Sequence, residues 1–139
     1  MSIEAHKTAI RRAVSNFSAA TLENYLQLYA ADAKLHFLPP GLPQGVEGAR
    51  LFYQSFLAAF PDARMTIDDF VAEADTVATR YSLEGTHQGE FMGVAPTGRH
   101  VTVSGISILR FNDDGKCVER WNEANLVSLL RQIGAMPNS

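Results

Sequence analysis

The hydrophobic period of the chain changes near residue 62, and this change constrains the fold more than any other feature. Before it, apolar residues recur at helical spacings, as Ile10, Val14 and Phe17 do, which is typical of one face of a helix. After it, apolar and polar residues alternate, as in the segment 77–83, which is typical of a half-buried strand. Helices that come first and strands that follow favour an α+β fold over repeated βαβ units.

Turn and cap residues divide the two halves into elements. Pro61 ends one helical segment, and Asn112–Gly115 forms a hairpin turn whose residue types tolerate a positive φ. Thr21 is placed to cap a helix, and Gly134 is placed to end one. The pattern predicts helices over 3–17, 22–29, 47–60 and 126–133, and strands over 34–38, 63–67, 77–83, 101–111 and 117–121.

The links between the later strands are of hairpin length, which favours an antiparallel sheet. We expect this sheet to curl around the N-terminal helices as a cone-shaped barrel, whose wide end is a natural ligand cavity. A flat two-layer sandwich without a cavity is the alternative. The 139 residues, 46% of them hydrophobic, fit a single domain over 1–139 with a substantial core.

Composition argues against several classes of protein. The 12 Lys and Arg residues against 15 Asp and Glu residues provide no basic surface for nucleic acid. No apolar run reaches the ~18 residues of a membrane span, and the charged N-terminus is unlike a signal peptide. Because Cys117 is the single cysteine and forms no internal disulfide, we expect a cytoplasmic protein in which this thiol is buried and inert.

The histidines show no tight metal-binding spacing, so we expect no metal site. The common phosphate-loop, dinucleotide, zincin and serine-hydrolase motifs are also absent from the sequence. We expect His6 and His100 to be solvated surface residues. His36 precedes a proline-rich loop, where it is either a rim residue bonded to backbone or a general acid/base at the mouth of a pocket.

One predicted strand carries a charge on an apolar face. Arg110 shares that face with two isoleucines, so it needs either a partner or a cavity. Glu119, across the hairpin, can be that partner, and a paired arginine can still donate to a ligand carbonyl. Glu119 also alternates with Trp121 and Glu123, and an indole beside acidic groups can wall a pocket and raise their pKa values.

Several blocks of the sequence resemble those of one family. In order and spacing, over about 30–134, they are similar to the SnoaL-like polyketide cyclases of the nuclear-transport-factor-2-like superfamily. The resemblance implies a cone-shaped α+β barrel with an apolar cavity, a homodimer or larger homo-oligomer such as a tetramer, and an enzyme without metal or organic cofactor. The blocks are AFPD at 59–62, GTHQGEFMGVAPTGR at 85–99, DGKCVERW at 114–121 and LRQIG at 130–134.

The resemblance also implies a reaction, the closure of a ring of an aromatic polyketide by intramolecular aldol condensation. In the family, the aspartate that removes the proton lies four residues after the tryptophan, where this chain has Asn125. An amide cannot act as a general base. Either Glu119, Glu123 or His36 takes over the proton transfer, or the chemistry differs. Relatives of the cyclases resemble cofactor-free aromatic hydroxylases, in which Asn125 and Arg110 would stabilise a substrate enolate or phenolate.

These observations lead to a hypothesis for the site. We expect Asn125 and Arg110 to bind substrate oxygens inside the cavity, while His36 or an acidic neighbour moves the proton. The competing class of function is a non-catalytic module that binds a small hydrophobic or aromatic ligand or dimerises. His87 is expected chiefly as a hydrogen-bonded anchor of its glycine-rich loop. The candidate substrate contacts are Trp121, Tyr81, Phe56, Glu123 and His87.

Overall fold

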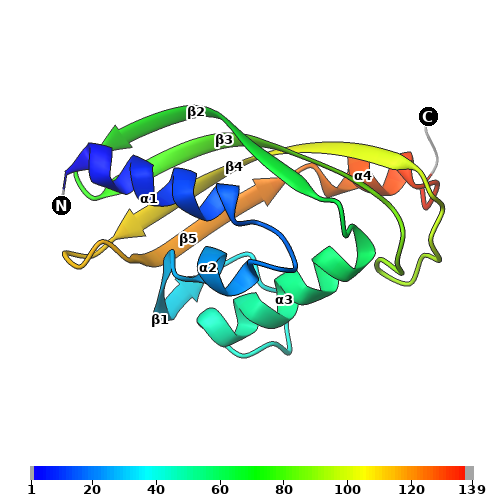
Figure 1. Ribbon diagram of the computed structural model, residues 1–139, viewed down its shortest axis with the longest axis horizontal. Coiled ribbons are helices and arrows are strands. Elements are labelled where there is room, and N and C mark those ends of the chain that lie inside the picture. Colours follow the sequence, from blue (N-terminus) through cyan, green and yellow to red (C-terminus); the bar gives the residue numbers. More distant parts are fainter. Residues whose placement is uncertain (1, 137–139) are drawn as a thin grey trace.

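The computed structural model describes residues 2–136 and confirms the predicted α+β class, with helices first and strands later (Figure 1). Most boundaries agree with the sequence pattern to within a few residues. The elements are α1 (Ile3–Ser15), α2 (Leu22–Leu26), β1 (Tyr29–Leu35), α3 (Val46–Ala59), β2 (Arg64–Glu73), β3 (Thr76–Thr86), β4 (His100–Phe111), β5 (Cys117–Ala124) and α4 (Leu126–Gln132).

The first strand begins earlier than the sequence pattern predicts. The chain leaves α2 after Leu26, and the backbone N–H of Cys117 donates to the carbonyl of Leu28 at 2.8 Å. The Lys116 side chain also donates to the carbonyl of Gln27 at 2.7 Å. These long-range bonds hold the segment against β5, so tertiary pairing outweighs the helical spacing of its apolar residues.

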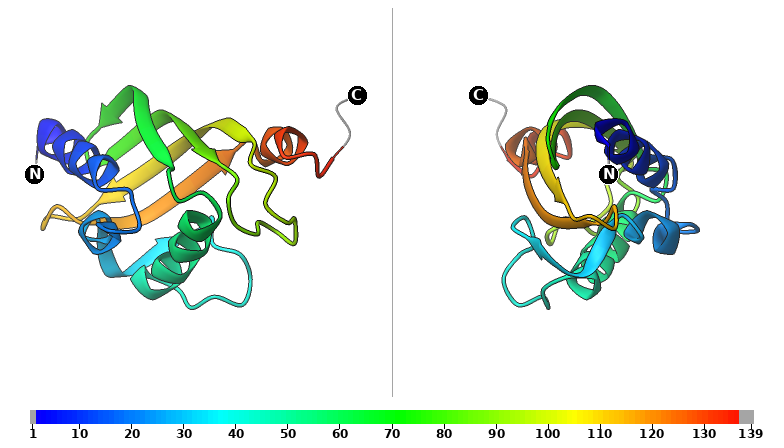
Figure 2. Two further views of the ribbon diagram at one scale, coloured as in Figure 1. Left: turned by 45° about the vertical axis from the view of Figure 1, so that its right-hand side comes forward. Right: turned by 90° about the vertical axis from the view of Figure 1, so that its left-hand side faces the viewer.

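The strands form one five-stranded sheet in the order β1–β5–β4–β3–β2. The neighbours from β2 to β5 pair antiparallel as predicted, but β1 pairs with β5 in parallel. Figure 2 shows the sheet curving around α1, with α2 and α3 on the same, concave side. The expected barrel is not closed, because β1 and β2 are the two edges of the sheet.

The two faces of this sheet differ in what covers them. The concave face packs against the first three helices and supplies much of the core, including Val77, Val101, Leu109 and Phe111. The convex face carries apolar side chains that remain accessible. Among them, Ile106 is 55% exposed, while Ile108 and Trp121 are each 41% exposed.

Two predicted chain reversals are confirmed. In the β4–β5 hairpin, the Asn112 side chain accepts from the backbone N–H groups of Asp114 and Lys116, and Gly115 has a φ of 78°. At the end of α4, Gly134 has a φ of 82° and its N–H donates to the carbonyl of Arg131 at 3.0 Å. Both glycines occupy left-handed conformations that an L side chain rarely adopts.

Within residues 2–136, no helix is both long and apolar enough to cross a bilayer. In the same part of the chain, no three His, Cys, Asp or Glu side chains gather closely enough to hold a metal ion. Cys117 is fully buried, as predicted, and burial raises the pKa of its thiol to about 11. The thiol therefore stays protonated at neutral pH and lacks the thiolate that a nucleophile needs.

Candidate active site

Four of the predicted site residues do lie together, at the end of the convex face where β1, β4 and β5 meet. Glu119 Oε2 lies 2.8 Å from His36 Nε2, and Glu119 Oε1 accepts from Arg110 Nη2 at 2.9 Å. The His36 ring stacks on the indole of Trp121 with centroids 5.0 Å apart. The hydrogen bond from His36, followed by that from Arg110, lowers the pKa of Glu119. These hydrogen bonds outweigh the effect of burial, so the pKa of Glu119 is not raised, contrary to expectation.

This convex cluster faces solvent rather than an interior cavity. The side chains of His36 and Arg110 are 45% and 42% exposed. The expectation that Arg110 points at a ligand inside the fold is therefore wrong. Its ion pair with Glu119 is present, as the sequence suggested, but it lies on the outer surface.

A β-bulge decides which residues of β5 face inward. β5 has one residue, Val118, more than the stretch of β4 with which it pairs. Such an extra residue shifts the alternation of side chains by one position. Cys117 faces inward before the bulge and Arg120 faces inward after it, so Trp121 points outward. Simple alternation from the buried cysteine would have placed the tryptophan inside.

Small residues on β4 explain why its isoleucine face is the outer one. The inward positions include Gly105 and Ser107. A Cβ atom on Gly105 would lie 2.5 Å from the hydroxyl oxygen of Tyr81, so only glycine leaves room for that phenol. Ser107 in turn accepts a hydrogen bond from Arg120. The interior at this level is filled by large polar side chains from the neighbouring strands.

Asn125 caps a helix instead of lining a cavity. Its side-chain oxygen accepts from the backbone N–H of Ser128 at 3.0 Å, and its own N–H donates to the carbonyl of Ser104 at 3.1 Å. Asn125 and Glu123 are both exposed. The inward placement expected for Asn125 is therefore wrong, and an asparagine directly before an apolar helical run is indeed a common N-cap signal.

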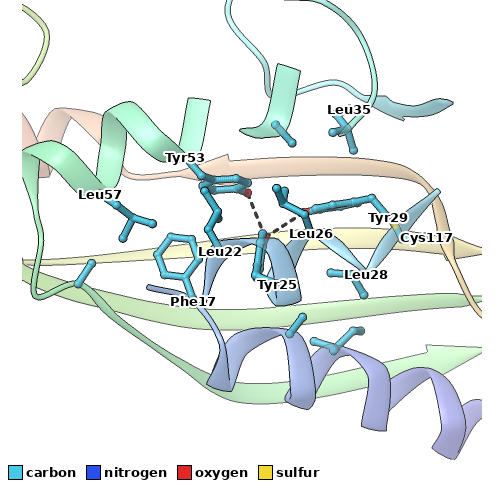
Figure 3. Close-up of a cluster of buried hydrophobic side chains, with 14 of the residues drawn as sticks. Phe17, Leu22, Tyr25, Leu26, Leu28, Tyr29, Leu35, Tyr53, Leu57 and Cys117 are labelled. Carbon is cyan, nitrogen blue, oxygen red and sulfur yellow. Dashed lines mark hydrogen bonds between the residues drawn. The ribbon is translucent and has the colours of Figure 1, made fainter. Parts of the chain in front are cut away.

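A second polar cluster, which sequence reasoning missed, lies on the concave face around Arg120, a residue only 6% exposed. Arg120 Nη1 donates to the phenol oxygens of Tyr25, Tyr29 and Tyr53 at 3.1, 2.5 and 3.2 Å. Figure 3 shows the three tyrosines converging from α2, β1 and α3, with Tyr25 bonded to both of the others. The guanidinium also lies over the ring of Phe37, 5.0 Å from its centroid.

The other side of the guanidinium meets a row of polar residues that crosses the sheet. Arg120 Nη2 donates to Ser107 Oγ at 2.8 Å. The side-chain oxygen of Asn122 accepts from Ser107 Oγ and from the Tyr81 hydroxyl, both at 2.7 Å. Ser107 lies opposite Asn122 on β5 and opposite Thr79 on β3. We name these polar residues, together with Arg120 and its three tyrosines, the Arg120 cluster.

The Arg120 cluster holds a cation whose hydrogen-bond partners, among the described residues, are all neutral. Burial is the main cause that raises the pKa values of Tyr29 and Tyr53. The positive charge of Arg120 lowers both pKa values but only partly offsets the effect of burial. Burial alone would lower the pKa of Arg120, but the surrounding phenols outweigh it and the net direction is upward. At neutral pH the cluster therefore combines one permanent positive charge with uncharged phenols, an amide and hydroxyls.

The remaining candidates lie on the concave side but at different places. Tyr81 belongs to the Arg120 cluster. Phe56 is half-buried and packs against Phe60 with ring centroids 5.1 Å apart. His87 is fully buried, and its Nδ1 accepts from the backbone N–H of Thr97 at 3.2 Å, so the geometry of the expected loop anchor is present.

The expectation for His6 is wrong, whereas His100 is exposed as predicted. His6 is only 3% exposed and stacks on Phe111 with centroids 4.5 Å apart. Burial is the main cause that lowers the pKa of His6. The helical pattern did place His6 four residues before Ile10, on the same buried face of α1.

Two pockets of about 500 Å³ and 540 Å³ lie away from both clusters. The first lies between α1 and the β4–β5 hairpin, and the second lies between α1 and β2. In the described structure, the space next to Arg120 is occupied by tyrosine rings rather than by an open cavity of the expected kind.

The sequence profile of the SnoaL-like polyketide cyclases matches residues 7–133. The chain belongs to the SnoaL-like polyketide cyclase family. The family resemblance inferred from the sequence blocks is therefore confirmed. The curved sheet with helices on its concave side is also the fold of the solved structures that this SnoaL-like protein resembles.

Two of these solved structures are similar in sequence as well as in fold. IdmH, a candidate polyketide cyclase from Streptomyces antibioticus, is 36% identical over 93% of this chain and 98% of that chain, with a TM-score of 0.80. AclR, a candidate hydroxylase from Streptomyces galilaeus, is 31% identical over 99% of this chain and 86% of that chain, with a TM-score of 0.87.

A third structure supports the fold alone. TsrD from Streptomyces laurentii is 23% identical over 98% of this chain and 99% of that chain, with a TM-score of 0.88. No curated protein sequence matches the chain.

Proposed function

We propose that this SnoaL-like protein is a cofactor-independent enzyme that acts on an aromatic polyketide or similar carbonyl-rich small molecule. In this proposal, Arg120 stabilises the enolate or phenolate form of the substrate. The observation that carries the proposal is a buried guanidinium with neutral partners only. A buried charge without a counter-charge is costly, and an anionic substrate oxygen would supply that counter-charge. Family membership supports the substrate class.

The donor geometry allows such an oxygen to take the place of a phenol oxygen. Arg120 Nη1 has two N–H groups but lies within hydrogen-bond distance of three phenol oxygens. A substrate oxygen can therefore replace one of the longer contacts, to Tyr25 or Tyr53, without leaving the guanidinium short of partners. In apolar surroundings, a fixed cation beside a developing enolate lowers the barrier to its formation more than it would in water.

An intramolecular aldol reaction then balances within the substrate. The C–H bond next to the Arg120-bound carbonyl breaks, and its electron pair forms a C–C bond to a second carbonyl carbon. The second carbonyl oxygen becomes an alkoxide and takes up a proton, for which the neutral phenol of Tyr29 is the donor nearest to Arg120. The proton released from carbon passes to a solvent water molecule and from there to the phenolate left on Tyr29, so the phenol is restored and no proton is gained or lost.

A naphthol tests the electrostatic part of the proposal, because its ionised form has a distinct absorbance. With the wild type, the bound naphthol should ionise at a pH lower by about one unit, or about 1.4 kcal/mol, than the free compound. Arg120→Gln should abolish this shift, whereas Arg110→Gln on the convex face should keep it. No shift with the wild type, or loss of the shift in Arg110→Gln, would contradict the proposal.

A hydroxylase is the second candidate function. The chain is similar to AclR, and among the described residues the Arg120 cluster contains an amide, Asn122, but no carboxylate that could serve as the base of an aldol reaction. Hydroxylation requires dioxygen as oxidant and two electrons, which a reduced hydroquinone-type substrate can supply.

The mass of the product separates these functions when the protein is incubated with carbonyl-rich aromatic polyketides. An isomer of equal mass, or its dehydrated form that is lighter by one water molecule, indicates the cyclase, and a product with one more oxygen atom, formed only with dioxygen, indicates the hydroxylase. Binding without any new product indicates the non-catalytic module.

A further inference from the structure

The loop between β3 and β4 is fastened at its base. The backbone N–H of His87 donates to the carbonyl of Arg99, and that of Gly98 donates to the carbonyl of His87, both at 2.9 Å. Gly89 donates to the carbonyl of Ala59 at 3.1 Å, and a Cβ on this glycine would lie only 2.3 Å from the carbonyl oxygen of the preceding helix residue, Ala58. The base of the loop therefore fits closely against the end of α3.

The tip of the same loop is bonded differently. Phe91 and Val94 exchange two backbone hydrogen bonds at 3.0 and 2.9 Å, and the two residues between them, Met92 and Gly93, have φ values of 48° and 81°. Both central residues thus have the positive φ of a tight hairpin turn. The Phe91 ring lies edge-on against Phe60, with centroids 5.3 Å apart. In the described structure, ring contacts rather than backbone bonds hold this tip against α3.

A buried donor that has no hydrogen-bond partner within residues 2–136 lies beside Phe60, the ring that Phe91 contacts. Nδ1 of His87 accepts a hydrogen bond from the Thr97 backbone N–H, so the proton of the neutral ring is on Nε2. His87 is 0% exposed and stacks on Phe60 with centroids 5.5 Å apart. Among the described residues, His87 Nε2 has no hydrogen-bond partner. A buried N–H without an acceptor is rare and favours a ligand that supplies one.

We propose that Phe91 occupies a ring-binding subsite, from which a planar aromatic ring of the ligand displaces it. The incoming ring would pack against Phe56 and Phe60, as Phe91 does now at 6.1 and 5.3 Å. A carbonyl or phenol oxygen on that ring would accept from His87 Nε2. The aromatic ligand class rests on the proposed function, but the subsite itself rests on these contacts.

A chain of aromatic rings connects this subsite with the Arg120 cluster. Phe17 lies between them, with its ring centroid 6.4 Å from that of Phe56 and 5.2 Å from that of Tyr25. Phe17 itself is only 4% exposed, so these rings form a packed connection between the two sites rather than an open channel. The subsite by itself therefore predicts a preference for a planar aromatic ring that carries a carbonyl or phenol oxygen able to accept from His87 Nε2.

Equilibrium binding of anthraquinone tests the displacement. Removing the intramolecular competitor in Phe91→Ala should tighten binding by about three- to tenfold, the value of an aromatic pair contact. Met92→Ala is the matched control, because Met92 lies at the same tip but is 63% exposed, and it should leave the affinity unchanged. Equal or weaker binding by a folded Phe91→Ala protein overturns the subsite. If Phe91→Ala does not fold, Phe91→Leu provides the same comparison with a smaller expected gain.

Nitrogen NMR of the histidine rings tests the hydrogen bond. Anthraquinone should shift the His87 Nε2 resonance, whereas anthracene, which lacks an acceptor, should not produce the hydrogen-bond shift. An unchanged resonance with bound anthraquinone overturns the role of His87. Arg120→Gln separates this inference from the proposed function, because it should abolish the ionisation shift of naphthol while Phe91→Ala still tightens binding in that background.

Discussion

The concave and convex faces of the sheet each hold an arginine in a polar cluster, yet the two clusters differ in nearly every physical respect. Arg110 on the convex face is paired with Glu119 and half-exposed. Arg120, on the concave face, is buried and bonded to neutral phenols, a hydroxyl and an amide. The comparison teaches that an arginine already paired with a carboxylate at the surface presents little net positive potential to a ligand. A buried cation among neutral groups retains that potential.

The largest expected difference between the faces is in stability. Arg120→Ala leaves buried phenol and hydroxyl groups without their donor and a cavity in place of the side chain. These losses should exceed the relief from removing an unpaired buried charge, and we expect the free energy of unfolding to fall by about 3 kcal/mol. Arg110→Ala removes a half-exposed pair and should cost less than about 1 kcal/mol. Urea unfolding of both variants measures the difference. Equal losses would show that the two arginines are not as differently placed as the structure indicates.

The next effect concerns Asn125, at the point where the convex face meets α4. Because its side chain caps the helix, Asn125→Ala should lower the free energy of unfolding by about 1 kcal/mol. Asn125→Asp retains the cap and should restore most of that loss. Naphthol ionisation should be unchanged in both variants. Loss of the ionisation shift in Asn125→Ala, with stability intact, would show that Asn125 contributes to ligand binding.

A smaller effect, confined to acidic pH, is expected from His6, which is buried on the concave side. Burial lowers the pKa of His6, so the unfolded chain binds the proton more readily than the folded protein does. The contribution of the neutral, buried His6 to the free energy of unfolding is complete above the unfolded pKa of about 6.5 and is lost as the pH falls below it. Thermal unfolding between pH 8 and 5 should show this decline, and His6→Phe, which retains a ring against Phe111, should flatten it. A parallel decline in both proteins would argue against a buried neutral His6.

The smallest effect is expected at Glu119 on the convex face. The hydrogen bonds from His36 and Arg110 lower the pKa of this carboxyl group, so its contribution is present above the unfolded pKa and disappears as the pH falls through the folded one. Glu119→Gln should therefore be slightly less stable than the wild type at pH 7, and this difference should shrink as the pH falls below the unfolded pKa of about 4.3. High salt should reduce the difference at pH 7, because exposed pairs are screened. A difference that does not shrink as the pH falls would point to a contact other than the ion pair.

The sequence determined the elements and the family. The change of hydrophobic period predicted helices before strands, and the hairpin turn at 112–115 and the stop at Gly134 were readable from residue types alone. The blocks around 85–99 and 114–121 carried the family resemblance that the profile match confirms. These signals are local, because caps, turns and short motifs depend on neighbours along the chain.

Only the tertiary structure decided which side chains meet inside the fold. A period of two shows that Glu119, Trp121 and Glu123 share a face, but it does not show which face the helices cover. That outcome depends on the bulge at Val118, which exists only because β5 pairs with β4 in a particular register. The single extra residue turned Arg120 inward, toward phenols from three distant elements. The local pattern of the sequence does not predict these contacts, because they depend on long-range strand pairing.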